Sequence, residues 1–461
     1  MPIKSAAAVT AAACAVCAFT AAAPAAKAAP AGMTPAAATA PALPSSDPFY
    51  DYRGPAPLAR IAPGTVLASR GATLKLEGLT VPVRTEQVLY RTTGEEGEPA
   101  ATVTTIIRPL SAAGGRIVAY QNAYDALGTE CDPSYTLRGG NDGDTNGQVE
   151  EGAIAAYVAA GDTVTVPDYE GEKLQWGAGQ ESGYGTLDAI RATENYLKAP
   201  AGTRVGMLGY SGGSIATEWA SELAPSYAPG LNIVGTAVGG VPVDYAHVLN
   251  YIDGDKDWSG IMPAFLISLP QAFREQIGQY LSPYGKRLMS QVAGKCIADF
   301  ASSYPGLTFS RLLKAPYTSP QEIPAFVRII NHLIMGTTQG HPDEPMLIGV
   351  GNEDGTGDGI MIARDEQELA YEYCQRGVPV TFQQYPGLPH EEAALPWEAS
   401  AQAFLQGRLA GLPAPDGCAS ITPGNSLAPL PVPSSSSLWQ CHYESFRETI
   451  SSASGAMAPM I

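Results

Sequence analysis

A serine flanked by glycines constrains the fold of this chain more than any other feature, in the stretch Gly209-Tyr210-Ser211-Gly212-Gly213. The apolar run 204–208 before it has the character of a short buried strand. The residues after it have helical spacing, with apolar side chains at Ile215, Trp219 and Leu223. A strand that turns sharply into a helix holds the serine oxygen above the sheet edge, beside free N–H groups. Ser211 is therefore a candidate nucleophile.

The net charge excludes one broad class of function. The chain of 461 residues has 27 Lys and Arg against 45 Asp and Glu, a formal net charge of −18. Binding to nucleic acid relies on clustered cations, and the sequence has no basic stripe, so we exclude nucleic acid as a partner. The length allows either one large domain with insertions or two domains.

Residues 1–28 have the pattern of a signal peptide. Lys4 supplies a positive start, residues 6–22 are alanine-rich and mildly apolar, and Ala26-Lys27-Ala28 fits a cleavage site. Alanine favours the membrane interior less than leucine does, so we expect no stable membrane anchor. Residues 29–46 are rich in Ala and Pro, which predicts a disordered linker. The mature protein is thus predicted to be secreted.

The cysteines beyond this leader are widely spaced. Cys14 and Cys17 lie in the leader, and five others follow: Cys131, Cys296, Cys374, Cys418 and Cys441. Their spacing fits no zinc motif, whereas export permits disulfides. Because five is an odd number, at least one cysteine stays unpaired or pairs with another chain.

Predicted strands and helices alternate along most of the mature chain. We expect strands at 88–93, 101–107, 117–120, 162–166, 204–208, 233–238, 345–350 and 378–385. The alternation indicates an α/β fold whose mostly parallel sheet is covered by helices. Residues 243–341 break the rhythm with apolar residues at helical intervals, which predicts an inserted α-helical cap. The core would then comprise residues 47–242 and 342–418, followed by a C-terminal extension at 419–461.

His390 is the candidate base for Ser211, because a serine hydroxyl needs a base to become a nucleophile. It follows the strand expected at 378–385 through a loop, and a helix is expected at 397–409. The other four histidines fall in the cap, before the last strands or in the tail: His247, His332, His341 and His442.

The base needs an acid to orient it. Three carboxyl groups share one glycine-rich loop after the strand expected at 345–350: Glu353, Asp354 and Asp358. Asp358 lies nearest the apolar return into the core, but position on the loop does not select among the three.

An oxyanion needs two hydrogen-bond donors. The N–H of Gly212, directly after Ser211, is the first candidate. The second is expected in the loop 121–126, either as a main-chain N–H or as a protonated Asp125 side chain, because an ionised carboxylate would repel the oxyanion.

A metal or cofactor is not expected. Residues 142–147 resemble the first half of a calcium loop, but Ala153 stands where such a loop has its glutamate. We therefore predict a polar turn there, no metal site and no cofactor.

Several longer motifs make the chain resemble the secretory lipases of the yeast lipase A type, which also occur in bacteria. The resemblance extends over about residues 47–418. It is carried by Asp47-Pro48-Phe49-Tyr50, Tyr120-Gln121 with Asp125-Ala126, Cys131-Asp132-Pro133-Ser134-Tyr135, Asp168-Tyr169-Glu170-Gly171, Gly209 to Gly213, Tyr227-Ala228-Pro229 and Gly239-Gly240-Val241-Pro242-Val243.

The resemblance implies an α/β-hydrolase core, an inserted cap and a catalytic triad of Ser211, Asp358 and His390. It places the second oxyanion donor at Asp125, beside Gly212. It also implies two disulfides, Cys131–Cys296 and Cys374–Cys418. The acid loop and the tail with Cys441 depart from the family pattern.

The function predicted from these features is a secreted carboxylester hydrolase, a lipase that acts on lipid or small esters through an acyl-enzyme. Three alternatives remain open at this point. An acyltransferase would use the same acyl-enzyme but exclude water, and a prolyl-type peptidase would share the fold and the triad. A non-catalytic binding protein on the same fold is the third.

Overall fold

The computed structural model of the chain describes residues 40–76, 78–111, 115–140 and 147–434. The predicted signal peptide, the calcium-like turn, Cys441 and His442 lie outside the described residues.

Regular structure is present before the predicted boundary at residue 47. Pro44–Ser46 forms a short 3-10 helix, and Pro44 is buried. Asp47 forms an ion pair with Arg70, at 2.6 Å between Oδ2 and Nη1. The last residues of the predicted linker 29–46 thus form a helical turn directly before Asp47.

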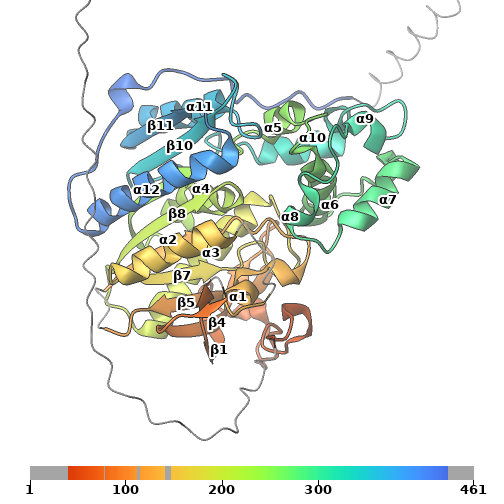
Figure 1. Cartoon of the computed structure of the whole chain (residues 1–461). Coiled ribbons are helices and arrows are strands. Elements are labelled where there is room, and N and C mark those ends of the chain that lie inside the picture. The colour runs from red at the N-terminus through yellow and green to blue at the C-terminus, as the bar shows by residue number, and fades with distance from the viewer. Residues whose placement is uncertain (1–39, 77, 112–114, 141–146, 435–461) are drawn as a thin grey trace, which may run out of the picture. The chain divides into compact units, whose positions relative to one another are not determined.

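One large sheet organises the described part of the chain, with the strand order β1-β4-β5-β7-β6-β8-β9-β10-β11 (Figure 1). Its first four members pair antiparallel, and all neighbours from β7 to β11 pair parallel. The bounds are β1 Val66–Ala72, β4 Arg84–Thr93, β5 Pro99–Arg108, β6 Arg116–Gln121, β7 Thr163–Pro167, β8 Arg204–Tyr210, β9 Asn232–Gly239, β10 Met346–Asn352 and β11 Val380–Pro386. A separate ribbon pairs β2 (Lys75–Leu76) with β3 (Leu79–Thr80).

Helices cover both faces of this sheet, as the alternation of the sequence predicts. On one face, α2 (Gly147–Ala159) and α12 (His390–Leu409) pack against each other and on the central strands. On the other face lie α3 (Gly179–Leu197), α4 (Gly212–Tyr227) and α11 (Ala363–Gln375). The parallel strands are buried from both sides, which explains their continuous apolar runs.

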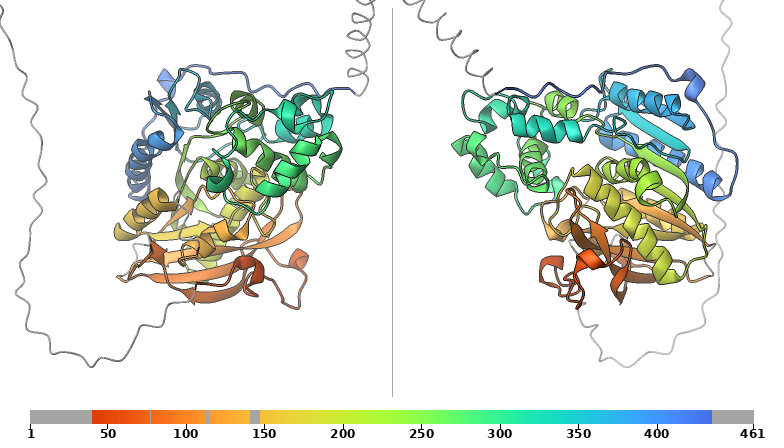
Figure 2. Two further views of the ribbon diagram at one scale, coloured as in Figure 1. Left: turned by 45° about the vertical axis from the view of Figure 1, so that its right-hand side comes forward. Right: turned by 180° about the vertical axis from the view of Figure 1, so that it is seen from behind.

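The predicted helical cap is present between β9 and β10. Residues 243–341 contain six α-helices and contribute no strand to the sheet. They are α5 Tyr245–Tyr251, α6 Met262–Ala272, α7 Pro283–Val292, α8 Ile297–Phe300, α9 Phe309–Leu312 and α10 Pro324–His332. Figures 1 and 2 show these helices, green to teal, beside the sheet rather than stacked on its faces. A short helix α1 (Pro133–Thr136) precedes α2.

The last helix begins earlier than the sequence suggests. We expect a helix at 397–409 and His390 in a loop, whereas α12 starts at His390 itself. Glu391 and Glu392 occupy the first turn, where negative charge favours a helix start, and Pro396 lies inside the helix. Pro396 is the reason why the sequence predicts too late a start for this helix, since prolines are common in the first turn of a helix.

Two disulfides join distant parts of the chain. Cys131 is bonded to Cys296 across 165 residues, and Cys374 to Cys418 across 44. These are the pairs that the family resemblance implies. The first bridge fastens the beginning of α8 in the cap to the segment that follows β6.

Removal of the longer bridge should destabilise the protein. In Cys131→Ala/Cys296→Ala the free energy of unfolding should fall by roughly 3–5 kcal/mol, because the bridge closes a long loop in the unfolded chain. Guanidinium unfolding measures this, with Cys374→Ala/Cys418→Ala as the control that opens a shorter loop.

Non-reducing peptide mapping of the wild type should recover both bridges and leave Cys441 as a free thiol. A bridge from Cys441 to any of the other four would contradict the pairing.

Candidate active site

Four sequence-predicted site residues meet at one edge of the sheet. Asp125 follows β6, Ser211 follows β8, Asp358 follows β10 and His390 follows β11. These strands all run parallel, so their carboxyl ends share an edge. The loops at this edge form the crevice in which α/β proteins bind their ligands.

The turn at Ser211 is as sharp as the glycines predict. Ser211 has φ 53° and ψ −125°, a backbone conformation that costs about 1–3 kcal/mol for a residue with a Cβ. The helix α4 begins at the next residue. Gly213 is required by space, since a Cβ there would overlap the carbonyl oxygen of Gln121 in β6. Tight contact between the helix start and β6 therefore holds the strained serine.

Ser211, His390 and Asp358 form a continuous chain of hydrogen bonds. The distance from Ser211 Oγ to His390 Nε2 is 2.7 Å, and that from His390 Nδ1 to Asp358 Oδ2 is also 2.7 Å. The side chain of Asp358 is fully buried, and His390 is 3% exposed. The other oxygen of Asp358 accepts the N–H groups of Ile360 and Met361 at 3.1 and 2.7 Å.

The main chain reinforces the same pairing. The N–H of His390 donates to the carbonyl oxygen of Asp358 at 2.8 Å, and Tyr210 donates its hydroxyl to the carbonyl of His390 at 2.7 Å. The first N–H groups of a helix have no partner within the helix. The bond from the His390 N–H to the Asp358 carbonyl therefore also satisfies one of these groups at the start of α12.

Asp354 points elsewhere, although it shares the loop with Asp358. Its carboxyl group accepts the Tyr251 hydroxyl at 3.1 Å and the N–H groups of Thr356 and Gly357 at 2.7 and 3.1 Å. Burial is the largest single influence on the pKa of Asp354 and raises it, but these hydrogen bonds together outweigh burial and the pKa is lowered. Glu353 is exposed. Of the three candidate acids, the structure brings Asp358 to His390.

Asp125 lies directly beside Gly212. It is 3% exposed and has a positive φ of 41°, and a Cβ on Gly212 would overlap its Oδ1 atom. Two further carboxyl groups surround its loop: Glu150 accepts the N–H of Ala123, and Glu170 accepts that of Ala126. The two predicted oxyanion donors therefore lie side by side at the start of α4.

The two glutamates around the Asp125 loop have raised pKa values. Burial raises the pKa of Glu150 to about 8, and the charges of Glu398 and Asp125 add to the shift. Burial also raises the pKa of Glu170 well above its usual range, again with a contribution from the charge of Asp125. Glu150, Glu170 and Asp125 therefore form a group of acidic side chains within interaction distance of one another.

A narrow apolar cavity of about 20 Å³ lies at Ser211. Core and cap both contribute to its walls: Asp125, Trp176, Ser211, Gly212, Ile215, Pro242, Val248, Trp258, Ile261, Phe265, Ile297, Ile360 and Met361. Trp258 meets the His390 ring edge to face, at 5.4 Å between centroids, and Trp176 stacks on Phe265 at 4.6 Å. Sequence analysis does not single out the two tryptophans, because a wall residue and a core residue have the same apolar pattern.

The other described histidines lie apart from this site. His247 contacts Asp365, His332 contacts Gln180, and His341 contacts the carbonyl oxygen of Pro342. Among the described residues, no group of three or more His, Cys, Asp or Glu side chains is arranged to hold a metal ion.

The known proteins that this chain resembles carry the name lipase. The family model of the secretory lipases matches residues 143–417. Lipase A of Arthroderma benhamiae is 32% identical over 84% of this chain and 84% of its own, and the probable inactive lipase MT1628 of Mycobacterium tuberculosis is 35% identical over 74% and 77%. The crystal structure of Candida antarctica lipase A in its closed state superposes with a TM-score of 0.76, at 28% identity over 85% of this chain and 92% of that one.

These matches define the class of the protein as an α/β-hydrolase with an inserted helical cap, which confirms the predicted fold class. The chain belongs to the secretory lipase family and is a carboxylic ester hydrolase. Lipid or ester compounds are accordingly its class of substrate.

The contrast between the two aspartates yields a test of the acid. Asp358→Asn should lower kcat on a short p-nitrophenyl ester by roughly 10⁴-fold, because the orienting carboxylate fixes the histidine tautomer. Asp354→Asn, the matched control on the same loop, should lose far less, since its contacts go to Tyr251 and the loop backbone. The reverse order of damage would assign the acid to Asp354. Equal and modest losses would mean that neither carboxylate alone orients the base.

Proposed function

We propose that this protein is a secreted lipase that cleaves acylglycerol esters through a covalent acyl-enzyme on Ser211. One observation carries the proposal: the hydrogen-bonded series Ser211–His390–Asp358 opens into an apolar cavity. A candidate nucleophile, its base and its orienting acid thus lie beside an apolar wall, against which the acyl part of an ester can pack.

In the first step, Ser211 Oγ attacks the ester carbonyl while His390 Nε2 takes the hydroxyl proton. Asp358 accepts the hydrogen bond from Nδ1–H, which holds the ring in the productive tautomer and stabilises the imidazolium. The same ring then gives its proton to the leaving alcohol. In the second step His390 takes a proton from a water molecule, which attacks the acyl carbon. The bond from that carbon to Ser211 Oγ then breaks, His390 returns its proton to Oγ, and the acid is released.

The negative oxygen of each tetrahedral intermediate needs preorganised donors. We assign these to the N–H of Gly212 and to the carboxyl group of Asp125 in its neutral form. The position of Asp125 against Gly212 supports the assignment, as does the pair of carboxyl groups around its loop. An ionised Asp125 would repel the oxyanion.

Export is part of the proposal. The sequence pattern of residues 1–28 and the two disulfides support an oxidising, extracellular location. In the described part of the chain, no helix combines the length and apolar character needed to cross a bilayer.

Substitution of the nucleophile provides the direct test. Ser211→Ala should reduce ester hydrolysis on the order of 10⁶-fold and abolish labelling by a fluorophosphonate, because the attacking oxygen is removed. Ser226→Ala is the matched control, an exposed serine near the end of the same helix α4, and it should behave as wild type. Hydrolysis of p-nitrophenyl esters and triglycerides should proceed where proline-containing fluorogenic peptides are left uncut. Substantial activity in folded Ser211→Ala, or a preference for peptides or for alcoholysis over hydrolysis, would contradict the proposal.

The cap should determine which acyl chains fit. Phe265→Trp should shift the preferred chain length of p-nitrophenyl esters toward shorter acyl groups, because Phe265 lines the cavity from α6. Turnover of the acetate ester should persist. Leu269 lies one turn further along the same helix and is fully buried but not in the cavity wall, so Leu269→Met is the control. An equal loss on short and long esters would mean that Phe265 serves packing alone.

A further inference from the structure

The turn after β7 carries a motif that the proposed chemistry does not use, Asp168-Tyr169-Glu170-Gly171. Its first three side chains are buried, although two of them are acidic and the third has a hydroxyl group. Buried polar groups are costly unless they are hydrogen-bonded, so their partners indicate their role.

Tyr169 and Glu170 both bind the loop that contains Asp125. The hydroxyl of Tyr169 donates to the carbonyl oxygen of Asn122 at 2.6 Å. The carboxyl group of Glu170 accepts the N–H of Ala126 at 3.1 and 3.3 Å from its two oxygens. In return, the main-chain N–H of Glu170 donates to the hydroxyl of Tyr124 at 2.6 Å.

A second carboxyl group, that of the half-buried Glu150, holds the same loop from the opposite end. Glu150, in the first turn of α2, accepts the N–H of Ala123 at 2.9 Å and the side-chain amide of Asn122 at 3.1 Å. Glu150 therefore binds the loop just before Asp125, and Glu170 binds it just after.

Loop 121–126 needs contacts from other segments, because its backbone is strained at Asp125. Asp125 has φ 41°, in the left-handed region that a non-glycine residue adopts at a cost of about 1–3 kcal/mol. Such a conformation persists only where neighbouring contacts impose it. The contacts on Ala123 and Ala126 fix the chain on either side of Asp125 and leave its side chain against Gly212.

We propose that Glu150 and Glu170 are positioning residues, a two-carboxyl clamp that holds loop 121–126 so that Asp125 faces the oxyanion. The inference rests on the proposed role of Asp125 and assigns two residues that act through it. Neither carboxyl group touches the substrate.

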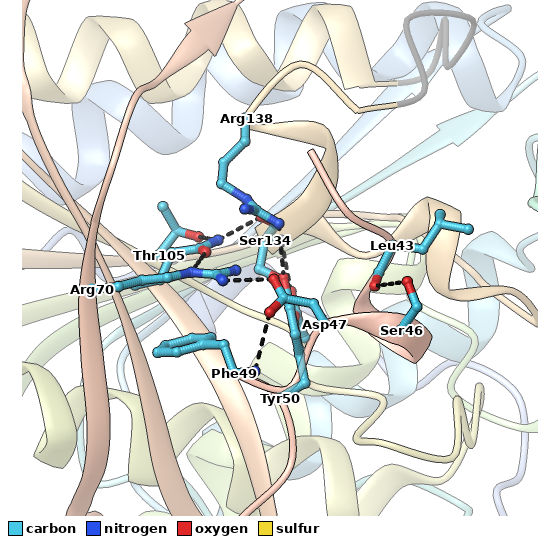
Figure 3. A network of polar contacts seen from close by, with 11 residues as sticks. Leu43, Ser46, Asp47, Phe49, Tyr50, Arg70, Thr105, Ser134 and Arg138 are labelled. Carbon is cyan, nitrogen blue, oxygen red and sulfur yellow. Dashed lines mark hydrogen bonds and ion pairs between the residues drawn. The ribbon is translucent and has the colours of Figure 1, made fainter. Parts of the chain in front are cut away.

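A further set of hydrogen bonds holds the turn that contains Glu170, through Asp168, the first residue of the motif. Asp168 accepts the hydroxyl of Ser134 at 2.5 Å and its N–H at 2.8 Å. Ser134 in turn meets the hydroxyl of Tyr50 at 2.7 Å, and its carbonyl oxygen accepts Arg138 at 3.0 Å (Figure 3). Hydrogen bonds from Tyr50 to Ser134 and from Ser134 to Asp168 therefore join three of the family motifs, at 47–50, 131–135 and 168–171.

Kinetics of substituted clamp residues test the proposal. Glu170→Ala should lower kcat on p-nitrophenyl butyrate by about 10–100-fold with KM changed less than about threefold, because a displaced oxyanion donor affects the transition state and not substrate binding. Glu170→Gln keeps an oxygen for the N–H of Ala126 and should restore most of kcat. Glu150→Ala should resemble Glu170→Ala. Fluorophosphonate titration counts the folded, reactive sites in every preparation.

The matched control is Glu344, which is also a buried carboxyl group whose pKa is raised by burial. It precedes β10, so it lies at the amino end of the strands and away from the site, where it accepts the hydroxyl of Thr236 at 2.7 Å. Glu344→Ala should lower the melting temperature without lowering kcat per titrated site. A loss of kcat as large as that of Glu170→Ala would mean that any buried carboxyl group has this effect, and would overturn the proposal.

A double-mutant cycle separates positioning from general damage. Asp125→Ala alone should cost about 10²–10³-fold in kcat. In the Asp125→Ala background, the further loss caused by Glu170→Ala should shrink to about threefold or less, because the clamp then has no donor to position. Equal losses in both backgrounds would overturn the clamp, as would full activity of Glu170→Ala beside a damaged Asp125→Ala. Full activity of Asp125→Ala would instead disprove the oxyanion role of Asp125, and the clamp proposal would fall with it.

Discussion

The close approach of helix α4 to strand β6 is the contact on which the site depends. Gly213 lies so near the carbonyl oxygen of Gln121 that no side chain fits between them, and Ser211 is thereby held at φ 53°. The same approach sets Gly212 beside Asp125, on the loop that continues from β6. One packing contact thus brings the proposed nucleophile and the proposed oxyanion donors into a single arrangement.

Much of this arrangement was predictable because it is encoded locally. The strand, the glycines and the helical spacing around Ser211 all lie within about twenty residues, and each has a direct physical meaning. The alternating strands and helices predict the parallel sheet for the same reason, and the fold class is confirmed. The order of the residues in the chain was enough to select His390. Its position at the start of α12 could not be predicted, because Pro396 suggests that the helix begins there.

The parts that were not predictable depend on contacts between distant segments. Asp354 and Asp358 look alike on one glycine-rich loop, and only folding turns Asp354 toward Tyr251 in the cap and Asp358 toward His390. Trp176 and Trp258 likewise become cavity walls only when core and cap meet. The clamp of Glu150 and Glu170 is invisible in the sequence, since nothing local distinguishes a carboxyl group that binds a loop from one that faces water.

The bridge between Cys131 and Cys296 closes a covalent ring that contains Ser211 and the first half of the cap, whereas Asp358 and His390 lie outside it. A protease that cuts once inside this ring opens it without releasing a fragment. The exposed residues Lys286 and Arg287 on α7 offer such a cut. The cut molecule would still hold Ser211, Asp358 and His390 in one covalent unit, and separating them would require reduction of the disulfide. In a medium that contains proteases, we expect the bridge to keep the two parts of a cut chain together.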